Sequence, residues 1–110
     1  MSGVPVQPVT VTVDSSGTIL CSPDPVIVKG PNVLLAFKLK TDGYAFAERN
    51  AITVDNPGSD FPYPSWTVKP QLATLLDLDG KVGSYSYNVS VVRCETGECI
   101  DGDPTIQNET

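Results

Sequence analysis

The sequence contains no histidine, and this absence restricts the chemistry of the chain more than any residue that is present. Imidazole is the commonest general base beside a serine or cysteine nucleophile, and a blue-copper centre needs it beside a cysteine thiolate. A glycine-rich phosphate loop is also missing, and no pair of carboxylates stands apart from turn residues. We therefore expect a protein that is not an enzyme and that has no cofactor and no bound metal.

Basic residues are scarce. Lysine and arginine total 7 against 13 aspartate and glutamate residues, which gives a formal net charge of −6. The basic residues occur singly along the sequence rather than in a block. Binding to nucleic acid or to an anionic membrane depends on clustered Lys and Arg. We expect neither as a partner, and the acidic balance is typical of a well-solvated surface.

Long apolar runs are absent too, and no stretch approaches the roughly 20 residues of a membrane-spanning helix. Residues 1–8 lack the basic and apolar regions of a secretory signal. We expect a cytoplasmic protein, although the mature form of a secreted one would have the same features.

The residues that are present suit one folded domain that spans 1–110. Hydrophobic residues make up 40% of the chain and charged residues 18%, far from the composition of disordered chains. Short apolar segments alternate with clusters of Pro, Gly, Asp and Asn, which are the residues of tight turns.

Apolar and polar residues alternate with period two, which predicts β-strands with one buried face. The clearest example places Tyr85, Tyr87, Val89 and Val91 together on one face. The expected strands span residues 9–13, 18–21, 26–28, 33–40, 51–54, 66–68, 72–78, 84–93, and a last edge strand from 99–100 and 105–106.

Two segments are ambiguous. Segment 44–47 is apolar but too short for its period to decide. Segment 72–78 also fits a helical period, but Pro70 and Gly80 confine it, and we favour a strand in which Thr74, Leu76 and Leu78 share one face. Seven or eight strands with frequent turns predict an all-β antiparallel sandwich.

The series Trp66 to Pro70, Thr74 to Leu78 and Gly83-x-Tyr85-x-Tyr87 resembles the late strands of a cupredoxin. In that pattern Val89 occupies the place of the copper-ligating cysteine. The resemblance implies a cupredoxin-like Greek-key sandwich that lacks copper ligands.

The dipeptides Asp24-Pro25 and Asp103-Pro104, with the segment 103–108 near the end of the chain, are similar to the small, uncharacterised bacterial DP-EP family. This resemblance implies the same cupredoxin-like sandwich. It supplies no catalytic or binding residue.

The best candidate contact surface lies in the segment Phe61-Pro62-Tyr63-Pro64-Ser65-Trp66. Prolines hold an extended backbone, on which Phe61, Tyr63 and Trp66 can present a large area with little loss of entropy. Alternatively, Phe61 and Trp66 fold back and plug one end of the sandwich.

Cys94 and Cys99 flank a four-residue loop and form a candidate thiol pair, because a hairpin there would place them opposite one another. They are either a redox pair or two ordinary thiols, and a reducing compartment would keep them reduced. We expect Cys21 to be a buried or half-buried small apolar residue. The motifs Asp77-x-Asp79-Gly80 and Asp101-Gly102-Asp103 are interpreted as turns.

Two functional hypotheses remain. The first is a non-catalytic, metal-free binding or interaction module, which contacts a protein partner through residues 58–66 or forms a homodimer through an edge strand. The second is a thiol-based redox or metal-handling protein that uses Cys94 and Cys99.

Overall fold

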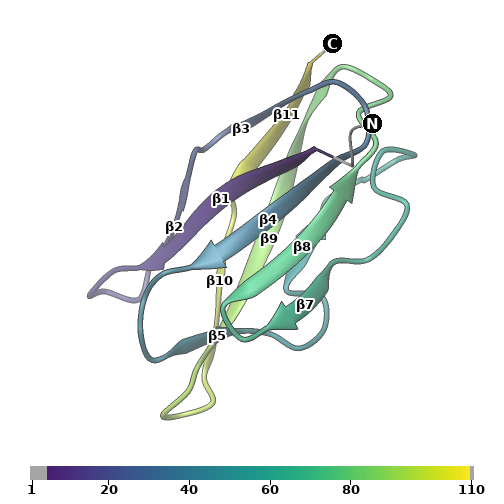
Figure 1. Cartoon of the computed structure of the whole chain (residues 1–110). Helices are drawn as coiled ribbons and strands as arrows, with labels where there is room; N and C mark the ends of the chain where they lie inside the picture. The colour runs from purple at the N-terminus through teal and green to yellow at the C-terminus, as the bar shows by residue number, and fades with distance from the viewer. Residues whose placement is uncertain (1–4, 110) are drawn as a thin grey trace.

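The computed structural model describes residues 5–109, so that residues 1–4, which are part of the segment without a secretory pattern, and Thr110 lie outside the described residues. Within this range the chain forms strands and no helix. The strands make two mixed sheets (Figure 1). The prediction of an all-β protein is confirmed.

The first sheet has five strands in the spatial order β2-β1-β4-β8-β7. Their bounds are β1 (Val6–Val13), β2 (Ile19–Ser22), β4 (Val33–Leu39), β7 (Trp66–Lys69) and β8 (Leu72–Asp77).

The second sheet is built around the long strand β9 (Gly83–Arg93). Its other strands are β3 (Val26–Lys29), β5 (Tyr44–Phe46), β6 (Ile52–Val54), β10 (Cys99–Gly102) and β11 (Thr105–Glu109). Strands β10 and β11 pair one after the other with β9, in the same antiparallel register. At the junction between these two strands, the amide of Tyr87 on β9 donates to the carbonyl of Pro104 at 3.0 Å.

Two details of the sequence-based prediction are wrong. Residues 5–109 form eleven strands rather than seven or eight, because short segments such as β5 and β6 each pair with a different part of β9. The sheets are mixed rather than antiparallel, because β1 pairs with β4 in parallel and β3 pairs with β11 in parallel. These pairings join segments that no tight hairpin connects, so turn signals could not reveal them.

The core lies between the two sheets, where the rings of Phe37 on β4 and Tyr87 on β9 approach to 5.6 Å between centroids. The period-two faces of both strands are buried as expected, while Tyr85 is half-buried. One cluster of buried apolar side chains contains residues of both sheets. The apolar side chains of the two sheets therefore pack against one another in a single core.

Strand β8 forms where we favoured a strand over a helix, but its buried face is the one not singled out. Ala73, Leu75 and Asp77 point into the protein, while Thr74 and Leu76 are only partly covered. An acidic residue consequently occupies a position in the core at the end of this strand.

The segment Asp101-Gly102-Asp103 is not a turn, because Asp101 and Gly102 belong to β10. Gly102 is required there by a close approach of β10 to β2. A Cβ at this position would lie 2.9 Å from Cβ of Ile19, closer than such atoms can pack.

We predict that Gly102→Ala lowers the free energy of unfolding by about 1–3 kcal/mol, since either Ile19 or the strand must move. Gly83→Ala is the matched control in the same sheet, because the nearest atom to its added Cβ is 4.0 Å away. Urea unfolding of both variants measures the difference, and equal stabilities would contradict the close approach.

Candidate functional site

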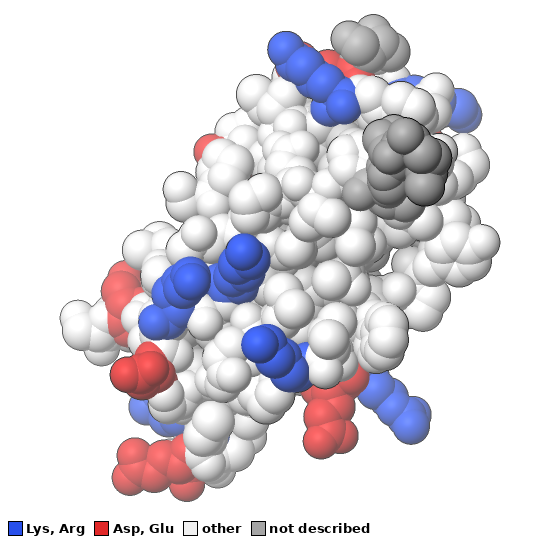
Figure 2. All heavy atoms as spheres, viewed as in Figure 1, with Lys and Arg blue, Asp and Glu red and all other residues white. Residues whose placement is uncertain are grey.

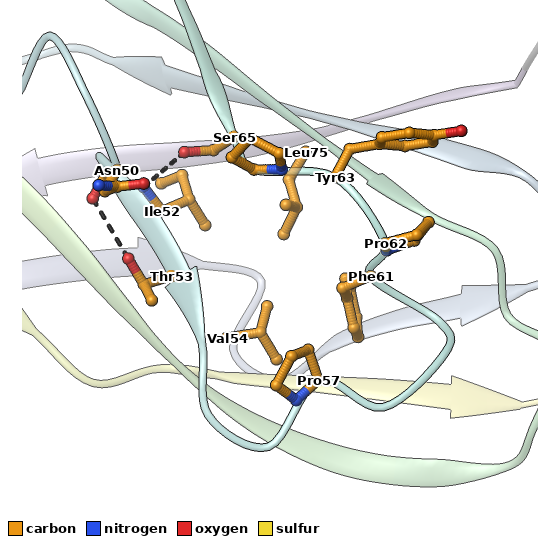
Figure 3. A pocket seen from close by; sticks show the side chains of 11 residues that line it. Asn50, Ile52, Thr53, Val54, Pro57, Phe61, Pro62, Tyr63, Ser65 and Leu75 are labelled. Atoms are coloured by element: carbon orange, nitrogen blue, oxygen red, sulfur yellow. Dashed lines mark hydrogen bonds between the residues drawn. The ribbon is translucent and has the colours of Figure 1, made fainter.

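A cavity of about 190 Å³ opens between strand β6 and the loop of residues 55–65 (Figure 3). Its wall is mostly apolar, and no lining residue carries a charge. The lining residues are Asn50, Ile52, Thr53, Val54, Pro57, Phe61, Pro62, Tyr63, Pro64, Ser65 and Leu75.

Local sequence explains the shape of this loop. Asn56 and Gly58 adopt positive φ angles of 49° and 58°, a region that asparagine and glycine tolerate best. Three prolines fix further backbone angles of the loop and its rim: Pro57, Pro62 and Pro64.

Phe61 turns inward from the loop and is 6% exposed, with its ring edge-on to Tyr85 at 5.0 Å. Tyr63 is 63% exposed at the rim, and in Figure 3 its ring points away from the centre of the cavity. Trp66 does not line the cavity. Of the three predicted contact residues, the structure therefore brings only Phe61 and Tyr63 to this site.

The alternative in which two aromatic residues plug the sandwich is correct for Phe61 and wrong for Trp66, which is 70% exposed. Trp66 lies opposite Thr74 in the ladder between β7 and β8, so its side chain is on the outer face of the first sheet. Phe61, by contrast, lies in the loop and is buried in the core.

Asp60 holds the loop against both sheets. Its carbonyl accepts a hydrogen bond from the amide of Leu78 at 2.8 Å, and its carboxylate accepts from the amide of Gly80 at 2.9 Å. The carboxylate also accepts from the Asn108 amide group at 3.1 Å and the Tyr85 hydroxyl at 3.2 Å. Burial opposes ionisation of Asp60, but these hydrogen bonds outweigh it and lower its pKa.

Two further aspartates are buried beside this anchor, Asp77 at 0% and Asp79 at 7% exposure. Asn108 Nδ2 donates to Asp77 Oδ1 at 2.9 Å and so links Asp77 to Asp60. Asp77 Oδ2 and both carboxylate oxygens of Asp79 have no hydrogen-bond partner among residues 5–109. Burial raises the pKa of Asp77 to about 6 and also raises that of Asp79.

The interpretation of the motif Asp77-x-Asp79-Gly80 as a turn is correct in part, because the amide of Asp79 donates to Asp77 Oδ1 at 2.9 Å. Its burial and its link to Asp60 were missed. The sequence did contain a sign of this burial, because Asp77 continues the alternation of Ala73 and Leu75 and so lies on their face of β8. Within the described range no three acidic or cysteine side chains are placed so that they could hold a metal ion.

The three cysteines are free thiols. Cys94 lies in the turn after β9, and Cys99 lies opposite Val92 rather than opposite Cys94. The expectation that the two thiols face one another is therefore wrong, since the register offsets them along the hairpin. Cys21 is half-buried as expected, and burial raises the pKa of its thiol to about 11.

No family model matches the chain, and no curated protein matches it. The described residues include no helix that is long and apolar enough to cross a membrane.

We predict that Asp77 makes stability depend on pH. Its pKa is about 6 when folded and near 3.8 when unfolded, so its contribution is complete below pH 4 and is lost as the pH rises to about 6. This loss should be on the order of 2–3 kcal/mol and should disappear in Asp77→Asn. Urea unfolding at a series of pH values measures the slope.

Asp55→Asn, which removes an exposed aspartate from the loop of residues 55–65, is the control and should keep the slope of the original protein. The ionised Asp60 has the opposite sign, because its lowered pKa gives stability that is lost as the pH falls through that pKa. An unchanged slope in Asp77→Asn between pH 4 and 6 would show that Asp77 does not hold the proton.

We also predict that the two aromatic residues of the loop differ in their effect on stability. Phe61→Ala should cost about 3–5 kcal/mol, as is usual for a buried ring, whereas Tyr63→Ala should change stability by about 0.5 kcal/mol or less. Thermal or urea unfolding measures both, and similar losses would contradict the different burial of the two rings.

Proposed function

We propose that this protein is a non-catalytic, metal-free interaction module that receives one apolar side chain of a protein partner in the cavity beside Phe61. The observation that carries the proposal is an open apolar cavity walled by a proline-rich loop that Asp60 holds in place. A preformed site of this kind binds with little ordering cost.

The size of the cavity favours a side chain over a larger ligand. Pockets for small molecules and cofactors are usually about 300–1,000 Å³, and this cavity is about 190 Å³. The exposed ring of Tyr63 at the rim offers a further contact of the kind that is common at protein interfaces. A single residue of a docked segment would fill the space.

The polar groups of the wall support binding rather than catalysis. Ser65 Oγ accepts from the amide of Ile52 at 3.1 Å, and Thr53 Oγ1 donates to the carbonyl of Asn50 at 3.3 Å. Neither hydroxyl has an acid or base beside it in the wall, and a nucleophile requires one. Recognition at this site would rest on shape and apolar contact.

We further propose that the two sheets form a cupredoxin-like Greek-key sandwich without copper. The order of β7, β8 and β9 and the Tyr85 and Tyr87 spacing support this assignment. So does Val89, which is fully buried in the core at the place of the expected cysteine ligand. The free thiols of the chain are typical of a reducing compartment and support a cytoplasmic location.

A homodimer through an edge strand receives less support than the cavity. The outer edge of β7 is bridged by Arg49, which pairs with Trp66, and by Ala47, whose carbonyl accepts from Thr67 Oγ1 at 2.6 Å. Residues 47–49 therefore cover part of the edge that a second copy would need.

The cavity can be tested with isobutanol and phenol, which mimic the side chains of Leu and Tyr, in an amide NMR titration. We expect shifts of the amides of Ile52, Val54 and Ser65 at millimolar probe. We expect Val54→Phe to weaken binding by about tenfold or more, because the side chain of Val54 points into the cavity (Figure 3) and the added ring would fill it.

Val82→Phe is the matched control, since it adds the same ring at an exposed valine outside the cavity wall. It should bind the probes as the original protein does. Shifts that do not saturate, or that Val54→Phe leaves intact, would rule out this cavity as the docking site.

A further inference from the structure

Three lysines that are separate in the sequence gather on the outer face of the first sheet. Lys38, Lys40 and Lys69 line one shallow pocket of about 210 Å³ together with Gln71 and Leu72. Figure 2 shows basic side chains close together over the ends of β4 and β7. The basic residues occur singly along the sequence, but the fold brings these three together on one surface.

The strand register produces the cluster. Leu72 on β8 pairs with Lys38 on β4 and with Lys69 on β7, so the two lysines flank it from either side. Lys40 follows Lys38 by two residues and projects from the same face, because strand residues alternate. All three lysines are exposed.

Trp66 lies beside this cluster. It pairs with Thr74, which is two residues from Leu72 on the same face of β8. Its side chain is 70% exposed, an unusual position for the only tryptophan of the chain. We call the surface formed by Lys38, Lys40, Trp66, Lys69 and Leu72 the lysine–tryptophan face.

Within the described part of the chain the lysines of this face form no ion pair, although Glu48 lines a neighbouring pocket together with Lys69. The ion pairs found among residues 5–109 join Lys29 to Glu109 and Arg93 to Glu98, and none involves the lysines of the face. A protein of net charge −6 thus presents one cluster of unpaired positive charge next to an exposed aromatic ring. Charge complementarity favours an anionic occupant.

The same charge distribution limits the length of that occupant. Acidic side chains lie at the margins of the molecule in the same view (Figure 2). A nucleic acid gains affinity from many successive phosphate contacts, and beyond three lysines it would meet a negative surface. A short segment with a few carboxylates avoids this repulsion.

We propose that the lysine–tryptophan face binds a short acidic segment of a protein partner, with an apolar side chain of that segment packed on Trp66 and Leu72. The lysines would pair with its carboxylates, and the exposed ring would supply the apolar contact that a charge pair alone lacks. This face lies on the opposite side of β8 from Leu75 and the cavity, and the proposal does not depend on the cavity.

The test uses a short fluorescein-labelled peptide of alternating glutamate and leucine, with a glutamine-for-glutamate peptide as its neutral counterpart. Anisotropy should show binding of the acidic peptide alone, weakened by added salt. Trp66 emission should change on binding. Lys38→Gln and Lys69→Gln should each weaken binding by about two- to fivefold. Trp66→Thr should weaken it as well.

Lys81→Gln is the matched control, an exposed lysine outside the face, and should leave binding unchanged. Val54→Phe should also leave it unchanged, so that this proposal and the cavity proposal fail separately. Equal binding of the neutral peptide, or equal effects of Lys81→Gln and Lys38→Gln, would overturn the proposal.

Two other occupants are outcomes of the same experiment. Tighter binding of single-stranded oligothymidylate than of the acidic peptide at equal salt would assign the face to nucleic acid. Self-association in sedimentation that Lys38→Gln abolishes would assign it to a second copy. Either result would overturn the acidic-segment proposal.

Discussion

The arrangement of the loop and the two sheets depends on the hydrogen bonds that the buried carboxylate of Asp60 accepts. It accepts hydrogen bonds from the turn after β8, from Tyr85 on β9 and from Asn108 on β11. One side chain from an irregular segment thereby ties together both sheets. Hydrogen bonds to an ionised group are stronger than those between neutral groups, so a carboxylate suits this role better than an amide.

The burial of Asp60 beside other acidic residues affects the ionisation of those residues. Asp77 and Asp79 are buried close to Asp60, and Asn108 donates to both Asp60 and Asp77. Ionised oxygens without partners are expensive to bury, which explains why one carboxyl of the cluster stays ionised while the pKa values of the others rise. The loop is therefore held by one ionised carboxylate, Asp60, whose two acidic neighbours have raised pKa values. Among the described residues, no basic side chain forms an ion pair with any of the three.

The strands could be predicted from sequence because their signal is local. Alternation along 33–39 and 83–93 reports which side chains are buried, and the structure agrees with it except at Ala36, which is also buried, and at Tyr85, which is half-buried. The sites depend on contacts between distant residues instead. Asp60 accepts a hydrogen bond from Asn108, which is 48 positions away in the sequence. Lys38 and Lys69 are brought together because each pairs with Leu72. The offset of Cys99 from Cys94 likewise follows from the register of β9 and β10, which loop length alone does not fix.

The two proposed surfaces lie on opposite sides of strand β8. Leu75 lines the cavity on one side, while Leu72 belongs to the lysine–tryptophan face on the other. Its neighbour β7 is the last strand of the sheet, so this short strand and residues 47–49, which cover part of its edge, stand between the two surfaces there. A partner that wraps around β7 would engage both surfaces with one continuous segment. The second contact would then form at a high effective concentration, and two weak sites would together behave as one bivalent clamp.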